Sequence, residues 1–86
     1  MSIQEEIREL TETLKNQRDE IALKVHLAGM EAKDEWEKAE KNWDHLSAKA
    51  GDIYDDTIET TEELVEAAKV IGDELANAYQ RIKNRL

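Results

Sequence analysis

The chain has 86 residues, enough for one small domain, and a domain of this size buries too little surface to be comfortably stable without disulfides, a metal or association with another chain. It contains no cysteine, which excludes disulfides, and no proline, while Ala, Glu, Lys, Leu and Asp dominate, as in long helices and coiled coils. The formal net charge of −9 makes nucleic acid and anionic membrane surfaces unfavourable partners.

The first residues predict a helix start and no export signal. Ser2 and Glu5 have the S-x-x-E spacing of a capping box, in which two side chains satisfy free backbone N–H groups, so a helix is expected from Ile3. The first fifteen residues hold four glutamates and no apolar run, and no segment reaches the roughly 18 apolar residues of a membrane span. We therefore expect a cytoplasmic protein that does not bind membranes.

A helical pattern without a break runs from about residue 3 to about residue 50. Gly51 then suits the end of a helix and Asp52 suits the start of the next one, so these two residues are the predicted turn. The second helix is expected over about residues 53–86.

The second helix has an alternative start. Thr60 and Glu63 also have the spacing of a capping box. With that start, residues 52–59 form an irregular loop.

Apolar and small residues form a stripe along each predicted helix, and the two stripes repeat the same steps of three and four residues outward from the turn. In an antiparallel hairpin this mirrored spacing fixes the register, so that the numbers of paired residues, such as Trp43 and Thr60, add to 103. The predicted seam consists of Ile21, Val25, Ala28, Ala32, Trp36, Ala39, Trp43, Leu46, Thr60, Leu64, Ala67, Ile71, Leu75, Ala78 and Ile82.

Trp36 and Trp43 lie on this stripe, and each faces a small residue in the predicted register. Large side chains opposite small ones fill a two-helix seam without overpacking, so we interpret the tryptophans as core residues rather than as part of a cofactor site. Gly29 and Gly72 fall in nearly the same layer, which predicts a close approach of the two helices there.

The predicted register leaves apolar surface uncovered. The second helix ends opposite Gln17, so residues 1–16 overhang the hairpin by about 20 Å with an apolar stripe that has no intramolecular partner. A second apolar stripe lies beside the seam on the second helix, and the first helix adds Leu23, Leu27 and Met30. Fraying of residues 1–16 is the alternative to their burial against another chain.

The expected fold is all-α and a single domain over residues 1–86. It is an antiparallel two-helix coiled-coil hairpin that self-associates, most simply into a four-helix bundle dimer. The residues assigned to self-association are Ile3, Ile7, Leu10, Leu14, Ile58, Val65 and Tyr79.

No catalytic, cofactor or metal site is predicted. His26 and His45 are nineteen residues apart on one predicted helix, about 28 Å, so they cannot share a metal within one chain. Asp52 and the acidic residues near it lack the residue order of an EF-hand calcium loop. Ser47 has only His45 nearby, on a different side of the helix, so it has no activating base. We expect a protein that is not an enzyme and that uses no cofactor.

One family resemblance can be stated. The segment from Leu27 to Leu46 reads LAGMEAKDEWEKAEKNWDHL and is followed by a glycine turn and a second acidic helix. In this it resembles a group of small acidic bacterial coiled-coil proteins, some labelled stress-response proteins, of unknown activity. The resemblance covers about residues 23–79, and its most distinctive part is the pair Trp36 and Trp43. It implies a cytoplasmic bacterial protein linked to stress and assigns no functional residue.

Two functions follow as hypotheses. The first is a non-enzymatic scaffold that associates with itself and with an unidentified protein partner. The second is an amphipathic helical protein that opens on lipid surfaces or on unfolded clients. The acidic polar face of the second helix, from Asp52 to Glu66, favours the first hypothesis, because helices on membrane surfaces usually carry lysine and arginine there.

Overall fold

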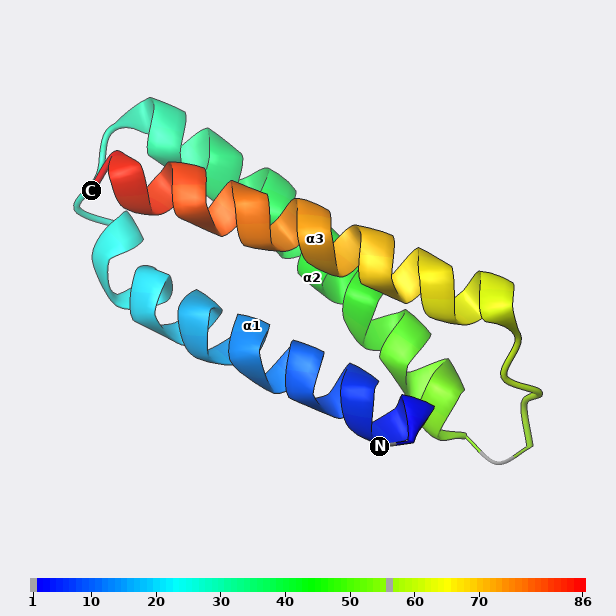
Figure 1. Cartoon of the computed structure of the whole chain (residues 1–86). Coiled ribbons are helices and arrows are strands. Elements are labelled where there is room, and N and C mark those ends of the chain that lie inside the picture. The colour runs from blue at the N-terminus through cyan, green and yellow to red at the C-terminus, as the bar shows by residue number, and fades with distance from the viewer. Residues whose placement is uncertain (1, 56) are drawn as a thin grey trace.

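The computed structural model describes residues 2–55 and 57–86 and contains three helices (Figure 1). Helix α1 spans Ile3–Val25, α2 spans Met30–Tyr54 and α3 spans Glu62–Asn84. α2 runs antiparallel to α1, and α3 returns alongside both, which gives a rod-shaped three-helix bundle of 43 × 19 × 17 Å. The all-α prediction is confirmed for the described residues, but the two-helix hairpin is wrong.

Helix α1 begins at Ile3, as predicted. The Ser2 hydroxyl oxygen accepts a hydrogen bond from the backbone N–H of Glu5 at 3.1 Å, which satisfies one of the free donors of the first turn. The single long helix predicted for residues 3–50 is nevertheless interrupted after Val25.

The first reversal of the chain, between α1 and α2, occupies residues 26–29. The backbone N–H groups of Leu27 and Ala28 donate to carbonyls three residues earlier, each at 3.0 Å. Gly29 precedes α2 with φ −71° and ψ 171° and has no side chain with which to cap the helix. Gly29 therefore lies at a reversal, with free space around it, and its predicted close approach to Gly72 is wrong.

Helix α2 continues through Gly51 and Asp52, so the predicted turn at these residues is wrong. An exposed glycine inside a helix costs about 1 kcal/mol relative to alanine. Ile53, which is fully buried, more than offsets this cost, since burial of an aliphatic side chain contributes about 1.5–3 kcal/mol. Continuation of the helix to Tyr54 is what brings Ile53 into the core.

The second reversal lies between α2 and α3. The Asp55 carboxylate accepts hydrogen bonds from the backbone N–H and the hydroxyl of Thr57, at 2.9 and 2.7 Å. Thr61 caps α3 because its hydroxyl oxygen accepts a hydrogen bond from the backbone N–H of Leu64 at 3.2 Å. The alternative prediction, a loop before a late start at Thr60, is therefore closer to the structure than a start at residue 53.

Ion pairs between α2 and α3 define their register. Arg81 lies 3.6 Å from Glu35, and Arg85 pairs with Glu31, so the residue numbers of each pair add to 116 rather than to 103. In an antiparallel pair, half of this sum is the position about which the chain reverses. Here it is 58, the middle of the 55–61 connection. The predicted register is wrong because it was centred on a reversal at residues 51–52.

The N-terminal segment does not overhang the bundle, because α1 packs on both other helices. Ile7 is fully buried, and Leu10 lies against Gly72. A Cβ atom added to Gly72 would come within 2.9 Å of Leu10 Cδ2, which gives the glycine inside α3 its packing reason. The segment predicted to lack an intramolecular partner is thus covered by its own chain.

The core runs along the axis of the rod between the three helices. Each helix contributes aliphatic residues or alanines, mostly at three- and four-residue spacing. The buried apolar residues are Ile7, Leu14, Ile21, Val25, Ala32, Ala39, Leu46, Ala50, Ile53, Val65, Ala68, Leu75, Ala78, Tyr79 and Ile82.

Candidate functional site

Three large apolar side chains are exposed at the end of the bundle where α1 turns into α2. Leu23, Leu27 and Met30 are 76%, 83% and 79% exposed. Leu23 and Leu27 are four residues apart, about one helical turn, and Met30 is the first residue of α2. Leu27 also lines a shallow hollow together with Leu86. We call Leu23, Leu27 and Met30 the apolar tip.

Leu23 and Met30 are exposed because they lie on the sides of α1 and α2 that face away from the core, and Leu27 lies in the reversal between them. Ile21 and Val25 occupy the core side of the last turns of α1. Leu23 lies midway between them in sequence, and two residues rotate a helix by about 200°, so its side chain points outward. Met30 is related to the buried Ala32 in the same way.

The two ends of the rod differ in charge. Residues 19–35 and 81–86, which surround the apolar tip, contain five acidic and five basic residues and have a formal net charge of zero. At the opposite end, residues 2–9, 52–55 and 57–66 contain nine acidic residues and one basic residue. The apolar tip is therefore at the end of an acidic molecule where charge does not repel a second copy.

Three of the five basic residues at this end, Arg81, Lys83 and Arg85, form ion pairs within the chain. Arg85 forms ion pairs with Glu31 and Glu35, and Lys83 Nζ lies 3.6 Å from Glu20 Oε2. These pairs connect the last turns of α3 to α1 and α2 and compensate the positive charge where α3 ends. Lys24, which lines the hollow with Leu27, and Lys33 are exposed at the same end.

Arg18 joins α1 to α2 in the middle of the bundle. Its guanidinium donates two hydrogen bonds to the Glu40 carboxylate, at 2.7 and 2.8 Å, and lies over the Trp43 ring, 5.6 Å from the ring centroid. The hydrogen bonds with Glu40 raise the pKa of Arg18, so the guanidinium stays charged. A two-bond pair of this kind fixes the relative position of the two helices.

Tyr79 of α3 lies near this pair and packs against Trp36, with the ring centroids 6.3 Å apart. Its hydroxyl is buried and has no hydrogen-bond partner among the described residues. Burial, and to a lesser degree the charge of Glu40, raises the pKa of Tyr79 above its ordinary value. The phenol therefore keeps its proton at neutral pH and is unsuited to act as a base or nucleophile.

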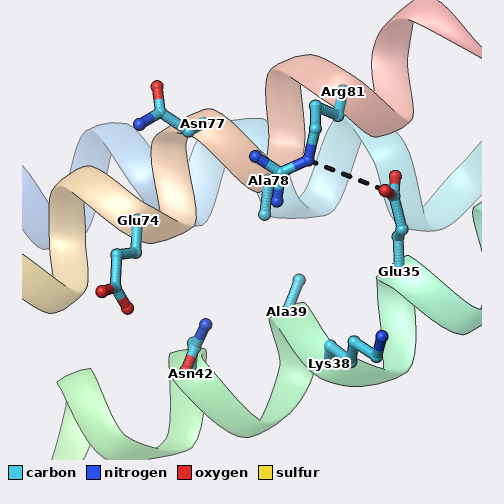
Figure 2. Close-up of a pocket in the computed structure, with 8 residues that line it drawn as sticks. All are labelled: Glu35, Lys38, Ala39, Asn42, Glu74, Asn77, Ala78 and Arg81. Carbon is cyan, nitrogen blue, oxygen red and sulfur yellow. Dashed lines mark ion pairs between the residues drawn. The ribbon is translucent and has the colours of Figure 1, made fainter.

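A groove of about 340 Å³ lies between α2 and α3 (Figure 2). Figure 2 shows Ala39 of α2 and Ala78 of α3 pointing toward each other across it, whereas Asn77 points away from α2. The Arg81–Glu35 ion pair closes one end. Glu74 of α3 and Asn42 of α2 also extend toward each other across the groove, but most ligand sites are lined mainly by hydrophobic and aromatic side chains, which this groove lacks. The groove is explained by two alanines that meet where larger residues would fill the space.

Residues 2–55 and 57–86 offer neither a metal site nor a membrane-spanning helix. No three His, Cys, Asp or Glu side chains in these ranges gather closely enough to hold a metal ion. None of α1, α2 and α3 combines the length and apolarity needed to cross a bilayer. His26, in the first reversal, and His45, on α2, are both exposed.

The residues of the predicted seam fall into three groups. Those that are buried are Ile21, Val25, Ala32, Ala39, Leu46, Leu75, Ala78 and Ile82. Those that are half-buried are Ala28, Trp36, Trp43, Leu64, Ala67 and Ile71. Thr60 is exposed in the second reversal. α3 is rotated relative to the prediction, because it faces α1 as well as α2.

The residues assigned to self-association are separated by the structure. Ile7, Leu14, Val65 and Tyr79 are buried inside one chain, and Leu10 is half-buried. Ile3 and Ile58 are exposed, at 48% and 41%. In the closed chain the five covered residues form the packing of α1 and α3 and do not face outward.

The sequence predicts that the residues of the apolar tip are uncovered by the seam, but it does not predict where in the molecule they lie. The steps of four and three residues from Leu23 to Leu27 to Met30 form a stripe out of phase with the seam. That spacing signals a second exposed face. It does not show that the face lies at an end of the molecule, since nothing in the pattern marks the reversal at residues 26–29.

Comparisons with known proteins were made for the whole chain. No protein-family model, curated protein or solved structure matches it.

Proposed function

We propose that this protein is a non-enzymatic helical scaffold that associates with a second copy of itself through the apolar tip. The observation that carries the proposal is the exposure of three large apolar residues at the end of the rod that has no net charge. A cytoplasmic location and the link to bacterial stress implied by the resemblance belong to the same proposal.

Physical reasoning favours a second copy as the partner. Removal of apolar surface from water contributes about 25 cal/mol per Å², so exposed leucines favour an apolar contact. The net charge of −9 opposes contact between two copies at the acidic end but not at the neutral end. A two-fold arrangement places the same tip on both sides of the contact and closes the assembly at a dimer.

Sedimentation equilibrium between 1 and 200 µM tests this proposal. The unmodified protein is expected to form a dimer, and a variant with Leu27→Glu and Met30→Glu is expected to be a monomer of unchanged helicity, because both residues are exposed in one chain. Val70→Glu is the matched control, since Val70 is 55% exposed in the middle of α3. A monomer throughout this range for the unmodified protein would refute the proposal.

The alternative function, binding to lipid surfaces or unfolded clients, requires the bundle to open. The amphipathic faces of the three helices are turned inward, so each would have to leave its neighbours to meet a lipid. Circular dichroism and flotation with phosphatidylcholine vesicles, and binding to a chemically unfolded test protein, examine this alternative. Flotation with vesicles, together with a monomeric protein in buffer, would favour it over the scaffold.

A further inference from the structure

The first reversal is close to helical over its first residues and departs from a helix at Gly29, whose ψ is 171°. His26 has φ −68° and ψ −16°, in the right-handed helical region, and the N–H groups of Leu27 and Ala28 donate backward along the chain as in a last helical turn. No described glycine has a positive φ, so no left-handed residue ends α1. A rotation at few backbone angles separates this reversal from a continuous helix.

The start of α2 is also the weakest of the three helix starts. Ser2 and Thr61 cap α1 and α3 with side-chain hydrogen bonds, whereas Gly29 has none to offer. The second reversal is different, since Asp55 and Thr57 hold it through side-chain hydrogen bonds.

The sequence keeps helical phase across the first reversal. The core stripe steps by four, three and four residues from Ile21 through Val25 and Ala28 to Ala32. The residues of the apolar tip step by four and three and would form one stripe on a continuous helix. The connection of a hairpin does not need to keep helical spacing of its apolar residues. A continuous helix through residues 26–29 does need it.

We infer that two copies exchange α1: residues 26–29 become helical, residues 3–54 form one continuous helix, and α1 of each copy packs on α2 and α3 of the other. This inference rests on the self-association proposed above and specifies how it is achieved. The two bundles then lie end to end, and the connections between the helices differ from those in a dimer of closed chains.

Exchange preserves the contacts that hold α1. The Arg18–Glu40 hydrogen bonds, the packing of Leu10 on Gly72 and the Lys83–Glu20 ion pair form again between chains with the same atoms. The register is preserved too. Arg18 and Glu40 have numbers that add to 58, so two antiparallel continuous helices in this register cross at Gly29 in both copies.

A disulfide between positions 10 and 72 distinguishes exchange from a contact between closed chains. A Cβ atom at position 72 would lie 3.3 Å from Leu10 Cγ, so the Cβ atoms of the two positions are at most about 4.8 Å apart, which a disulfide spans with little adjustment. The chain has no other cysteine. Leu10→Cys and Gly72→Cys are made as two single variants, one labelled with ¹⁵N.

The two variants are unfolded together, refolded under reducing conditions at 200 µM and oxidised. With exchange, mass spectrometry and a non-reducing gel show a disulfide that joins one labelled and one unlabelled chain. In a dimer of closed chains, the two positions of different copies lie at remote parts of the rod, and no such product forms. The reduced variants are first checked for the helicity and melting transition of the unmodified protein.

Substitutions of Gly29 provide a second measurement. Gly29→Ala removes an interior glycine from both continuous helices, meets no atom within 4 Å in the closed chain, and should strengthen the dimer by about 30-fold. Gly29→Pro fits the closed chain, where φ is −71°, but breaks a continuous helix, so it should weaken the dimer by at least about 1,000-fold. The melting transition of the monomer reports whether each variant still folds.

The outcomes separate the inference from the proposed function. A labelled–unlabelled disulfide, with opposite effects of the two Gly29 variants, supports exchange. A dimer of unmodified protein without that disulfide overturns exchange and leaves the association of closed chains. A monomeric unmodified protein overturns both.

Discussion

The chain reverses direction twice, and the two reversals are built differently. Residues 26–29 contain a glycine without a capping side chain and the exposed Leu27, and exposed Leu23 and Met30 lie on either side, in a neutral environment. Residues 55–61 contain Asp55 and Thr61, which both accept backbone hydrogen bonds, in an acidic environment, and Ile53 just before them is buried. The second reversal is specified by its own side chains, whereas the first depends on the packing of the helices that it joins.

This difference shows where the molecule can change without loss of its core. Hydrogen bonds from side chains to backbone compete with helix and hold a loop in one conformation. A connection without such hydrogen bonds is not itself stabilised in the bent conformation. The three most exposed large apolar residues, Leu23, Leu27 and Met30, lie at the first reversal, whereas Ile53 beside the second is fully buried and Ile58 within it is 41% exposed. Association and stability are therefore assigned mainly to opposite ends of one small bundle.

The largest expected contrast comes from the same type of truncation at both ends. Ile53→Ala should lower the free energy of unfolding by about 2–4 kcal/mol, because it leaves a cavity at a fully buried site. Leu27→Ala should change it by less than about 0.5 kcal/mol, since the side chain is 83% exposed. Urea unfolding followed by circular dichroism at 1 µM, where association does not contribute, measures both.

Equal losses from the two truncations would contradict the contrast between the ends. They would mean that Leu27 is buried at 1 µM, and hence that the tip is already covered. Repetition at 100 µM adds a check, since a loss that appears only for Leu27→Ala at high concentration belongs to the dimer.

Much of this fold follows from the sequence by simple rules. The cap at Ser2, the all-α class and the buried positions Ile21, Ala39 and Leu46 follow from local chemistry and helical periodicity. The break at residues 26–29 does not, because this segment contains no proline and keeps helical phase. Its bend is favoured by tertiary packing, which allows α1 to cover α3.

The register shows a second limit. The mirrored spacing predicts which faces of the helices meet. The register depends in addition on where the chain reverses, and Gly51 and Asp52 have the residue types of a reversal although they lie inside α2. The apolar tip was likewise seen as surplus surface without a location. Leu14 and Tyr79 are buried within one chain because a third helix covers what a pairwise seam leaves uncovered.

The next contrast concerns neighbouring threonines in the second reversal. Thr61→Ala removes the hydrogen bond to the N–H of Leu64 and should lower the free energy of unfolding by about 1 kcal/mol. Thr60→Ala is the matched control, since Thr60 is exposed and does not cap α3, and should have an effect below about 0.5 kcal/mol. Thermal unfolding of both variants at 1 µM makes the comparison. The assignment of Thr61 as the cap fails if Thr60→Ala is the more damaging change.

A smaller effect of opposite sign is expected at Gly51. Gly51→Ala should raise the free energy of unfolding by about 0.5–1 kcal/mol, because the residue is inside α2 and an added Cβ meets no atom within 4 Å. Alanine at a left-handed turn position would instead destabilise the protein. Urea unfolding thus distinguishes a helix through Gly51 from a reversal at Gly51, and a lower midpoint would restore the reversal at residues 51–52.

The smallest expected effect depends on pH and belongs to Asp55. The hydrogen bonds that its carboxylate accepts, first from the Thr57 hydroxyl and then from the Thr57 N–H, lower the pKa of Asp55 below its ordinary value of 3.8. Because the folded-state pKa lies below the unfolded one, this carboxylate stabilises the fold above about pH 4, and the contribution disappears as pH falls through the folded-state pKa. Asp55→Ala should therefore lower the melting temperature slightly at pH 7 and not at pH 2.

Loss of one negative charge at this acidic end also relieves repulsion, which acts in the opposite direction. Glu59→Ala removes an exposed charge from the same reversal and measures that relief, so the informative quantity is the difference between the melting temperatures of the two variants at each pH. Asp55→Ala should melt below Glu59→Ala at pH 7, and the two should converge by pH 2. A difference that persists at pH 2 would mean that Asp55 holds the second reversal by packing or by its backbone rather than through its ionised carboxylate, and the contrast with the first reversal would then rest on Thr61 alone.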